Sequence, residues 1–175
     1  MFVGEAPGFY EDQAGLPFVG PAGKLLDGLL EVAGLSRKDV FITNVVKHRP
    51  PANRDPEPDE LEACDDFLRA QIAAIKPQVI VTLGRFSLSK FFPNVRAMRD
   101  VHGRALPTSD GLTICAMYHP AAALHQNSLR AVLEQDFRAL PMILARAQSQ
   151  PATPVTVAQA ALPGVETPPE QMSLF

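Results

Sequence analysis

The sequence contains no hydrophobic run close to the length of about 18 residues that a membrane-spanning helix requires, so no transmembrane segment is predicted. It also lacks a basic segment followed by an apolar one at its start, which argues against a secretory signal and leaves the cytoplasm as the expected location. Its two cysteines are too few for a disulfide framework. Basic residues are not in excess either: the net charge is −3, which argues against a protein that coats nucleic acid through charge alone.

The 175 residues are enough for one domain with a substantial core, and their apolar runs follow two alternating patterns. Short β-branched runs predict buried strands at 1–4, 40–46, 78–83 and 112–118. Helical spacing predicts helices at 21–33, from about residue 59, after Gly84 and at 129–145, with the last kinked or split at Pro141. Strands that alternate with helices indicate an α/β fold with a parallel sheet covered on both faces.

The composition changes near the end of the chain. Residues 1–147 carry the alternating pattern and are predicted to form the folded domain, with a long glycine- and proline-rich loop at 5–20. Residues 148–175 contain five prolines and no Lys or Arg, so they are expected to be a flexible tail.

Side chains able to do chemistry follow three of the predicted strands. Glu5 follows the first strand, Asn44 lies near the end of the second, and His119 follows the last. Because the carboxyl ends of parallel strands meet at one edge of the sheet, these residues are expected to share a cleft with Phe18 from the glycine-rich loop. Each has a structural alternative: Glu5 as a turn cap, Phe18 as core and His119 as a structural histidine. Asn44 is the hardest to explain by folding alone, since a buried amide needs partners.

Two further features suit contacts with phosphate. The segment from Gly84 to Ser87 opens a predicted helix whose free N–H groups can bind an anion. The predicted loop 47–56 holds the one local basic cluster, whose alternative interpretation is a solvated surface. Its members are Lys47, His48, Arg49 and Arg54.

Six motifs occur in an order found in a known family: GEAPG, GLPFVGPAGKLL, TNVVKHRPP, the EAC helix, VTLGR and YHPAA. Over about residues 1–145 the chain resembles the family 4 uracil-DNA glycosylases, which are bacterial and archaeal base-excision repair enzymes. The resemblance implies a three-layer α/β/α sandwich with a central, mainly parallel four-stranded sheet. It also implies a monomeric, monofunctional hydrolase that flips uracil out of DNA and cleaves its N-glycosidic bond. The alternative is a catalytically weak DNA- or clamp-binding remnant of the family.

The resemblance assigns roles to the residues of the expected cleft. Phe18 would stack on the extruded uracil, and Asn44 would read its edge. His119 would lie near O2, where negative charge develops, and Glu5 would position or polarise the attacking water. The uracil-binding set is Gly4, Ala6, Phe18, Asn44 and His119, and the catalytic set is Glu5, Asn44 and His119.

Contacts with uracil-containing DNA are also implied by the resemblance. The segment after YHPAA resembles the loop that enters the minor groove, where Leu124 would fill the gap left by the flipped base. His125 stands where the family often has arginine. Arg85 and Ser87 are the further candidates for phosphate contacts.

The family carries a [4Fe–4S] cluster held by four cysteines. At the corresponding positions this chain has Cys64 and has His48 in place of a cysteine, and the remaining ligands are expected upstream of Met1. Loss of the cluster is the alternative. Cys115 lies inside a predicted strand and is expected to belong to the core. The short segment from Pro50 to Arg54 differs from the branch of the superfamily that forms a covalent adduct with DNA, so no adduct is predicted.

The chain ends in QMSLF, which resembles the pentapeptide with which bacterial repair proteins bind the DNA sliding clamp. A flexible tether with apolar residues at its end suits docking into a preformed pocket. A frayed terminus is the alternative. The predicted clamp-binding residues are Gln171, Met172, Leu174 and Phe175.

Overall fold

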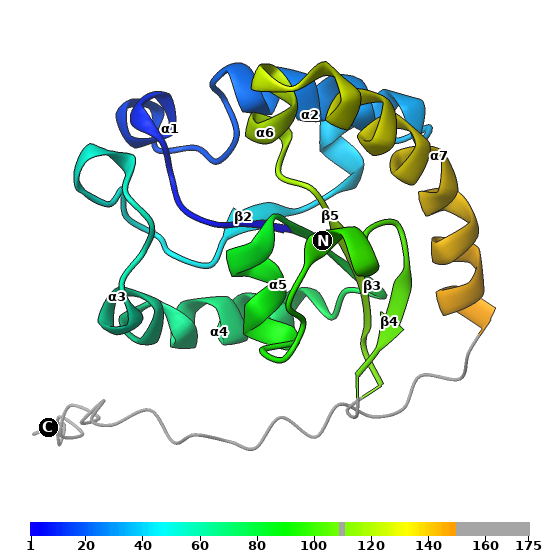
Figure 1. Cartoon of the computed structure of the whole chain (residues 1–175). Coiled ribbons are helices and arrows are strands. Elements are labelled where there is room, and N and C mark those ends of the chain that lie inside the picture. Colours follow the sequence, from blue (N-terminus) through cyan, green and yellow to red (C-terminus); the bar gives the residue numbers. More distant parts are fainter. Residues whose placement is uncertain (109–110, 150–175) are drawn as a thin grey trace, which may run out of the picture.

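A computed structural model describes residues 1–108 and 111–149 of the chain, and one five-stranded sheet forms its centre (Figure 1). The strands lie in the order β2-β1-β3-β5-β4. All neighbouring pairs are parallel except the last, in which β4 runs antiparallel to β5 at the edge of the sheet. The strands are β1 Phe2–Gly4, β2 Ile42–Asn44, β3 Val79–Leu83, β4 Ala105–Pro107 and β5 Thr113–Met117.

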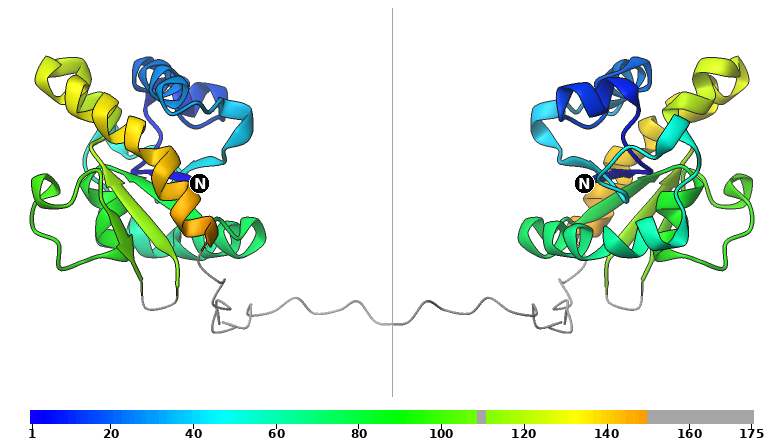
Figure 2. Two further views of the ribbon diagram at one scale, coloured as in Figure 1. Left: turned by 90° about the vertical axis from the view of Figure 1, so that its right-hand side faces the viewer. Right: turned by 90° about the vertical axis from the view of Figure 1, so that its left-hand side faces the viewer.

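Helices cover both faces of this sheet. Figures 1 and 2 show α2, α6 and α7 on one face and α4 and α5 on the other. The helices are α1 Phe9–Ala14, α2 Pro21–Val32, α3 Pro58–Ala63, α4 Asp65–Ile75, α5 Arg85–Phe91, α6 Pro120–His125 and α7 Asn127–Ser149, with short 3-10 turns η1 Arg37–Asp39, η2 Pro51–Asn53 and η3 Met98–Asp100.

Alternate residues of the central strands serve two separate cores. Phe2 and Val81 belong to the cluster that also contains buried residues of α2 and α7. Val3 and Ile80 belong to the second cluster, together with Leu68 of α4. Strands buried on both faces explain the continuous apolar runs in the sequence. The predicted three-layer α/β/α sandwich is confirmed.

The prediction of four strands is wrong, because β4 adds a fifth. This strand spans only Ala105–Pro107, its residues are mostly exposed, and it ends in proline. A short exposed edge strand has no apolar alternation, so its sequence gave no signal.

Three helices also differ from the predictions. The predicted loop 5–20 contains α1, which Gly15 ends in the left-handed conformation at φ +67°. The helix expected from residue 59 is two helices that meet at Cys64. The last helix was predicted to be kinked or split at Pro141, and it is not split: α7 continues through the proline with buried residues on both sides of it.

The tail lies outside the described residues, and with it the predicted clamp-binding residues of QMSLF. The predicted domain boundary at 147 falls near the end of α7, which runs to Ser149. Across residues 1–108 and 111–149, none of the helices has both the length and the apolar composition needed to cross a membrane.

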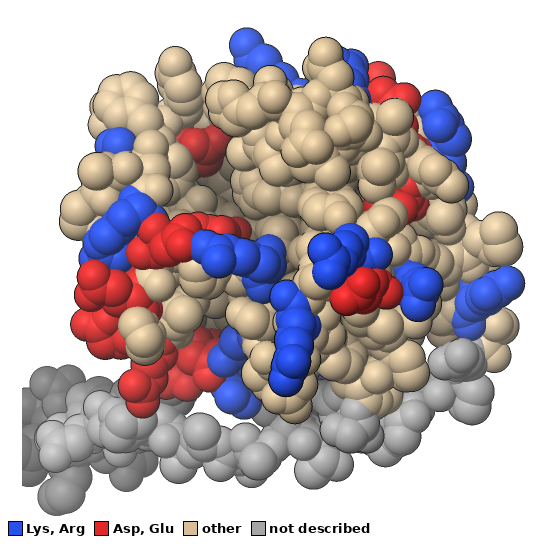
Figure 3. Space-filling view, viewed as in Figure 1, with Lys and Arg blue, Asp and Glu red and all other residues tan. Residues whose placement is uncertain are grey.

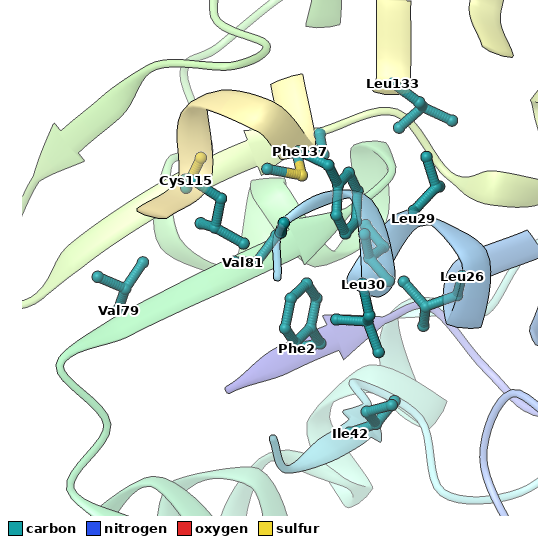
Figure 4. Packing of buried hydrophobic residues seen from close by; sticks show 14 of the residues in the cluster. Phe2, Leu26, Leu29, Leu30, Ile42, Val79, Val81, Cys115, Leu133 and Phe137 are labelled. Atoms are coloured by element: carbon teal, nitrogen blue, oxygen red, sulfur yellow. The ribbon is translucent and has the colours of Figure 1, made fainter. Parts of the chain in front are cut away.

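The larger core is held together by contacts between the first strand and the last helix. The rings of Phe2 and Phe137 stack with centroids 6.0 Å apart and an interplanar angle of 14°. Figure 4 shows side chains of α2 and of the strands gathered around this pair. Both phenylalanines are buried, with exposed fractions of 2% and 0%. The pair therefore ties α7 to the centre of the sheet.

Phe137→Ala should lower the free energy of unfolding by about 3–5 kcal/mol, because it leaves a cavity in a close-packed core. Met142→Ala on the same helix is the control, since Met142 is 60% exposed. The control should change the free energy of unfolding by about 0.5 kcal/mol or less. Chemical denaturation measures both, and equal losses in the two variants would contradict the assignment.

Candidate functional site

The carboxyl ends of the parallel strands open into a cleft of about 320 Å³. In Figure 3 the surface is hollowed between the regions that Figure 1 labels α1 and α6. A volume of this size is in the range of small-molecule sites. The cleft is lined by Glu5, Ala6, Pro7, Gly8, Glu11, Phe18, Ala22, Asn44, Pro50, Asn53, Arg54, His119 and Ala121.

The structure brings the predicted cleft residues together. Glu5, Ala6, Phe18, Asn44 and His119 all line the cleft. Gly4 lies behind two of them, and its lack of a side chain makes their approach possible. A Cβ at this position would lie 2.4 Å from Asn44 Oδ1 and 2.6 Å from Phe18 Cζ. The last residue of β1 therefore has to be glycine for the amide and the ring to stand where they do.

Asn44 presents an acceptor that has no partner. It ends β2 opposite Gly4 in the parallel register and is only 5% exposed. Its Oδ1 is buried without a hydrogen bond to any described residue. Buried polar atoms are nearly always hydrogen-bonded, so this oxygen is suited to accept from a ligand N–H.

The main chain at Asn44 is held by Lys47, which the sequence analysis assigned only to a basic cluster. Its Nζ donates to the carbonyl of Asn44 at 2.7 Å, to Gln71 Oε1 at 2.7 Å and to Thr43 Oγ1 at 2.8 Å. Burial lowers the pKa of Lys47 to about 8. Three acceptors on one ammonium group fix the end of β2.

Phe18 is held in a conformation that is uncommon for a residue with a side chain, with φ +54°. Glu11 fixes the chain directly after it, because its Oε1 accepts the N–H of Val19 at 3.0 Å and of Gly20 at 2.8 Å. Helix α2 packs against the same turn: a Cβ on Gly23 would lie 1.8 Å from the carbonyl oxygen of Phe18. The ring position is thus set by a carboxylate clamp on one side and a glycine contact on the other.

His119 lines the cleft with one ring nitrogen already engaged. It caps α6, and its Nδ1 accepts the N–H of Ala121 at 3.1 Å, so the proton of the neutral ring resides on Nε2. Burial lowers the pKa of His119 to about 4, with the charge of Glu11 acting in the opposite direction. The ring is therefore neutral at pH 7, and its centroid lies 5.5 Å from that of Phe18. Gly84 at φ +94° lets the histidine approach the end of β3, because a Cβ there would lie 3.1 Å from His119 Cβ.

Glu5 lines the cleft at the end of β1, where it is half-buried. Burial raises the pKa of its carboxyl group, the nearby Asp55 raises it further, and Arg85 opposes the rise. A carboxylate with a raised pKa is a better proton acceptor than a solvated one. Glu5 is therefore suited to a role as a general base.

The predicted DNA contacts lie outside the lining of the cleft. Arg85 forms an ion pair with Asp55, and its guanidinium lies over the ring of Phe86. Ser87 is fully buried and its hydroxyl donates to the carbonyl of Gly84 at 3.1 Å, so a phosphate contact by this side chain is not supported. Leu124 and His125 are exposed at the end of α6, which forms a short helix where a loop was expected. In Figure 3 acidic and basic side chains mingle below the hollow.

Two of the lining residues that shape this site, Glu11 and Asn53, were not predicted from the sequence. Glu11 was not singled out, because its function depends on hydrogen bonds to backbone groups eight and nine residues away. Asn53 lies in the loop that closes one side of the cleft and accepts from Arg49 Nε at 2.7 Å. An acidic residue within a glycine-rich loop was the only available signal for Glu11.

A match to a family model covers most of the chain. The model is that of the uracil DNA glycosylase superfamily, and it matches residues 1–140. The chain belongs to this superfamily.

Individual relatives identify the branch of the superfamily to which the chain is most similar. The chain is 50% identical over 146 residues to the type-4 uracil-DNA glycosylase of Saccharolobus solfataricus, a match that covers 79% of this chain and 68% of that protein. It is 45% identical over 155 residues to that of Archaeoglobus fulgidus, covering 85% and 78%. It is 45% identical over 139 residues to that of Thermotoga maritima, covering 78% and 72%. The type-4 resemblance seen in the motifs is confirmed.

The [4Fe–4S] cluster of the type-4 family does not fit the donors that the structure describes. Such a cluster needs four ligands. Cys64 is buried and its Sγ accepts the N–H of Lys47 at 3.3 Å, whereas His48 is exposed. In the part of the chain that the structure describes, no group of three or more His, Cys, Asp or Glu residues could hold a metal ion.

Cys115 is confirmed as a core residue. It is fully buried in β5, and burial raises the pKa of its thiol to about 12. A thiol that stays protonated at neutral pH is a poor nucleophile, which agrees with a structural role.

His119 should remain neutral until the pH falls to about 4, whereas an unfolded chain protonates it near 6.5. Because the unfolded state binds the extra proton, the free energy of unfolding should decrease as the pH falls from 6.5 to 4. Glu11→Gln keeps an oxygen for Val19 and Gly20 but removes the negative charge, so it should lower the pKa of His119 further.

NMR titration of the imidazole measures this pKa, with Asp12→Asn on the same helix as the control. A pKa near 6.5 in the wild type would contradict the burial of a neutral ring. An unchanged pKa in Glu11→Gln would contradict the electrostatic contact.

Proposed function

We propose that this chain excises uracil from DNA by hydrolysis of the N-glycosidic bond, and that the cleft at the strand ends holds the flipped base. The single observation that carries the assignment to this cleft is the buried, unpartnered Oδ1 of Asn44. The names of the relatives supply the reaction, since they are type-4 uracil-DNA glycosylases. A base must leave the helix to reach such a cleft, because the glycosidic bond is inaccessible within the stack.

Selection of uracil follows from the chemistry of one amide. Asn44 Oδ1 accepts from N3–H of uracil, and the amide nitrogen donates to O4. Cytosine has an unprotonated N3 and an amino group at this edge. Asn44 Oδ1 would then lie against N3, which is also an acceptor, and the amide nitrogen would lie against the amino group, which is also a donor. Buried groups left unpaired in this way disfavour the wrong base strongly.

Phe18 stacks on the face of the extruded uracil. Its ring is buried and fixed by the clamp of Glu11 and by the contact with Gly23. A ring already in place loses little conformational entropy when the base enters. Gly4 and Ala6 supply the small residues that leave room beside it.

Bond cleavage transfers the electron pair of the C1′–N1 bond to uracil, so negative charge develops on N1, O2 and O4. The Nε2–H of His119 donates to O2 and stabilises this charge. The neutral ring suits the role, because Nδ1 is already occupied by the N–H of Ala121 and the remaining proton lies on the nitrogen that is free to donate.

Glu5 accepts a proton from the water that attacks C1′. The water oxygen forms the new bond to C1′, and its second proton remains on the resulting hydroxyl group of the abasic sugar. The uracil anion then takes up a proton from solvent and Glu5 returns its proton to solvent, so the products are free uracil and an abasic site. The raised pKa of Glu5 favours this proton transfer.

The exposed Leu124 is proposed to fill the space that the flipped base leaves in the duplex. It is 45% exposed at the end of α6, and His119 begins the same helix. His125 beside it can reach the neighbouring phosphate. Arg85 would have to exchange its partner Asp55 for a phosphate, so its contribution to binding is smaller than that of an unpaired arginine.

Asn44→Ala should lower kcat/KM for uracil release by about 100-fold or more, because two hydrogen bonds to the base are lost in a buried site. Wild type, Asn44→Ala and the surface control Asn94→Ala are compared on single- and double-stranded oligonucleotides that contain uracil. Asn94 is exposed and does not line the cleft, so its replacement should leave release unchanged. Failure of the wild type to release uracil would instead support an inactive remnant.

The C-terminal QMSLF is proposed to bind the DNA sliding clamp through Leu174 and Phe175. Deletion of residues 171–175 should abolish capture by purified clamp, because the apolar residues of the motif are lost. Uracil release from short oligonucleotides should stay unchanged, which serves as the control for folding. Clamp capture that survives the deletion would exclude this motif as the binding segment.

A further inference from the structure

Helix α1 carries two large aromatic side chains that do not serve the core. None of its six residues is buried. Phe9 is 53% exposed and Tyr10 is 57% exposed, and their rings meet edge to face with centroids 5.6 Å apart. The two rings therefore present adjacent apolar surface that a ligand could cover.

A basic residue from another loop lies over this patch. The guanidinium carbon of Arg49 is 5.2 Å from the centroid of the Phe9 ring. Its Nε donates to Asn53 Oδ1 at 2.7 Å, and Asn53 is in the left-handed conformation at φ +54°. The cation is thus held against the aromatic face instead of extending into solvent. We call Phe9, Tyr10 and Arg49 the aromatic platform.

The aromatic platform is continuous with the mouth of the cleft. Gly8 and Glu11, on either side of the aromatic pair, line the cleft, as do Pro50 and Asn53 beside Arg49. Figure 1 shows α1 and the loop that contains η2 at the same side of the molecule. A strand whose uracil enters the cleft must therefore pass this surface or its opposite rim.

We propose that the aromatic platform stacks the base adjacent to the flipped uracil on the same DNA strand. The proposal rests on the proposed function of the cleft and adds a second contact to it. Aromatic faces stack on any base, so the contact does not select sequence. Arg49 adds a positive charge beside these rings, which favours a nucleotide with its phosphate over an apolar protein segment.

The test is a double-mutant cycle in which one change is made in the protein and the other in the DNA, and the binding affinity of each combination is measured. The single-stranded probe contains 2′-fluoro-2′-deoxyuridine, whose fluorine suppresses cleavage by destabilising positive charge on the sugar. In two further probes a tetrahydrofuran spacer replaces the base on the 5′ or the 3′ side. The proteins are wild type, the double variant Phe9→Ala/Tyr10→Ala and the control Phe67→Ala, which removes a 61% exposed ring from α4.

Wild type should bind one of the two spacer probes about tenfold more weakly than the intact probe. The double variant should bind the intact probe about tenfold more weakly than wild type does. Its affinity should not fall further when the probe carries the spacer to which wild type is sensitive. Phe67→Ala should behave as wild type. Wild-type affinity in the double variant, or losses that multiply when variant and spacer are combined, would overturn the proposal.

Release of uracil at saturating substrate separates this proposal from the function of the cleft. A wild type that binds the probes as expected but releases no uracil would remove the proposed reaction and leave the platform supported.

Discussion

The parallel hydrogen bonding of β1 to its two neighbours is the constraint on which the site depends. It sets Gly4 opposite Asn44 and brings the ends of β1, β2, β3 and β5 to one edge of the sheet. A slip of one residue would turn Asn44 toward the other face and would also move Phe2 out of its stack with Phe137. Burial on both faces of the sheet therefore enforces the same register that places Asn44 in the lining of the cleft.

Polar groups of the surrounding loops hold the cleft residues in place through hydrogen bonds between side chains and the backbone. Glu11 holds the turn after Phe18, Lys47 holds the carbonyl of Asn44, and the N–H of Ala121 fixes the tautomer of His119. None of these hydrogen bonds uses the Phe18 ring, Oδ1 of Asn44 or Nε2 of His119. The result is a cleft lined by the neutral imidazole of His119, by Asn44 Oδ1 without a partner among the described residues, and by the Glu5 carboxylate. Partly buried polar groups interact more strongly than they would in water.

The sequence predicted the structure correctly where burial restricts a segment to apolar residues. The four parallel strands were predicted from continuous β-branched runs, and the cleft residues from their position after strand ends. The exposed β4 and α1 were missed because neither buries a face. Glu11 and Lys47 were missed as supports because their roles consist of long-range hydrogen bonds, which leave no periodic pattern. Ser87 was placed at a helix start correctly, but its burial against Gly84 could not be inferred from spacing.

The positive φ of Phe18 carries a conformational cost, and it matters whether that cost falls on folding or on binding. A strained turn costs about 1–3 kcal/mol and persists only because the surroundings hold it. The protein thus meets this cost once, during folding, and not at each encounter with DNA. What then varies from one uracil to the next is the opening of the DNA, which is easiest where the base is mismatched or already unpaired. For the proposed function, a cleft shaped before the base arrives leaves the ease of opening the DNA as the step that differs from one uracil to the next.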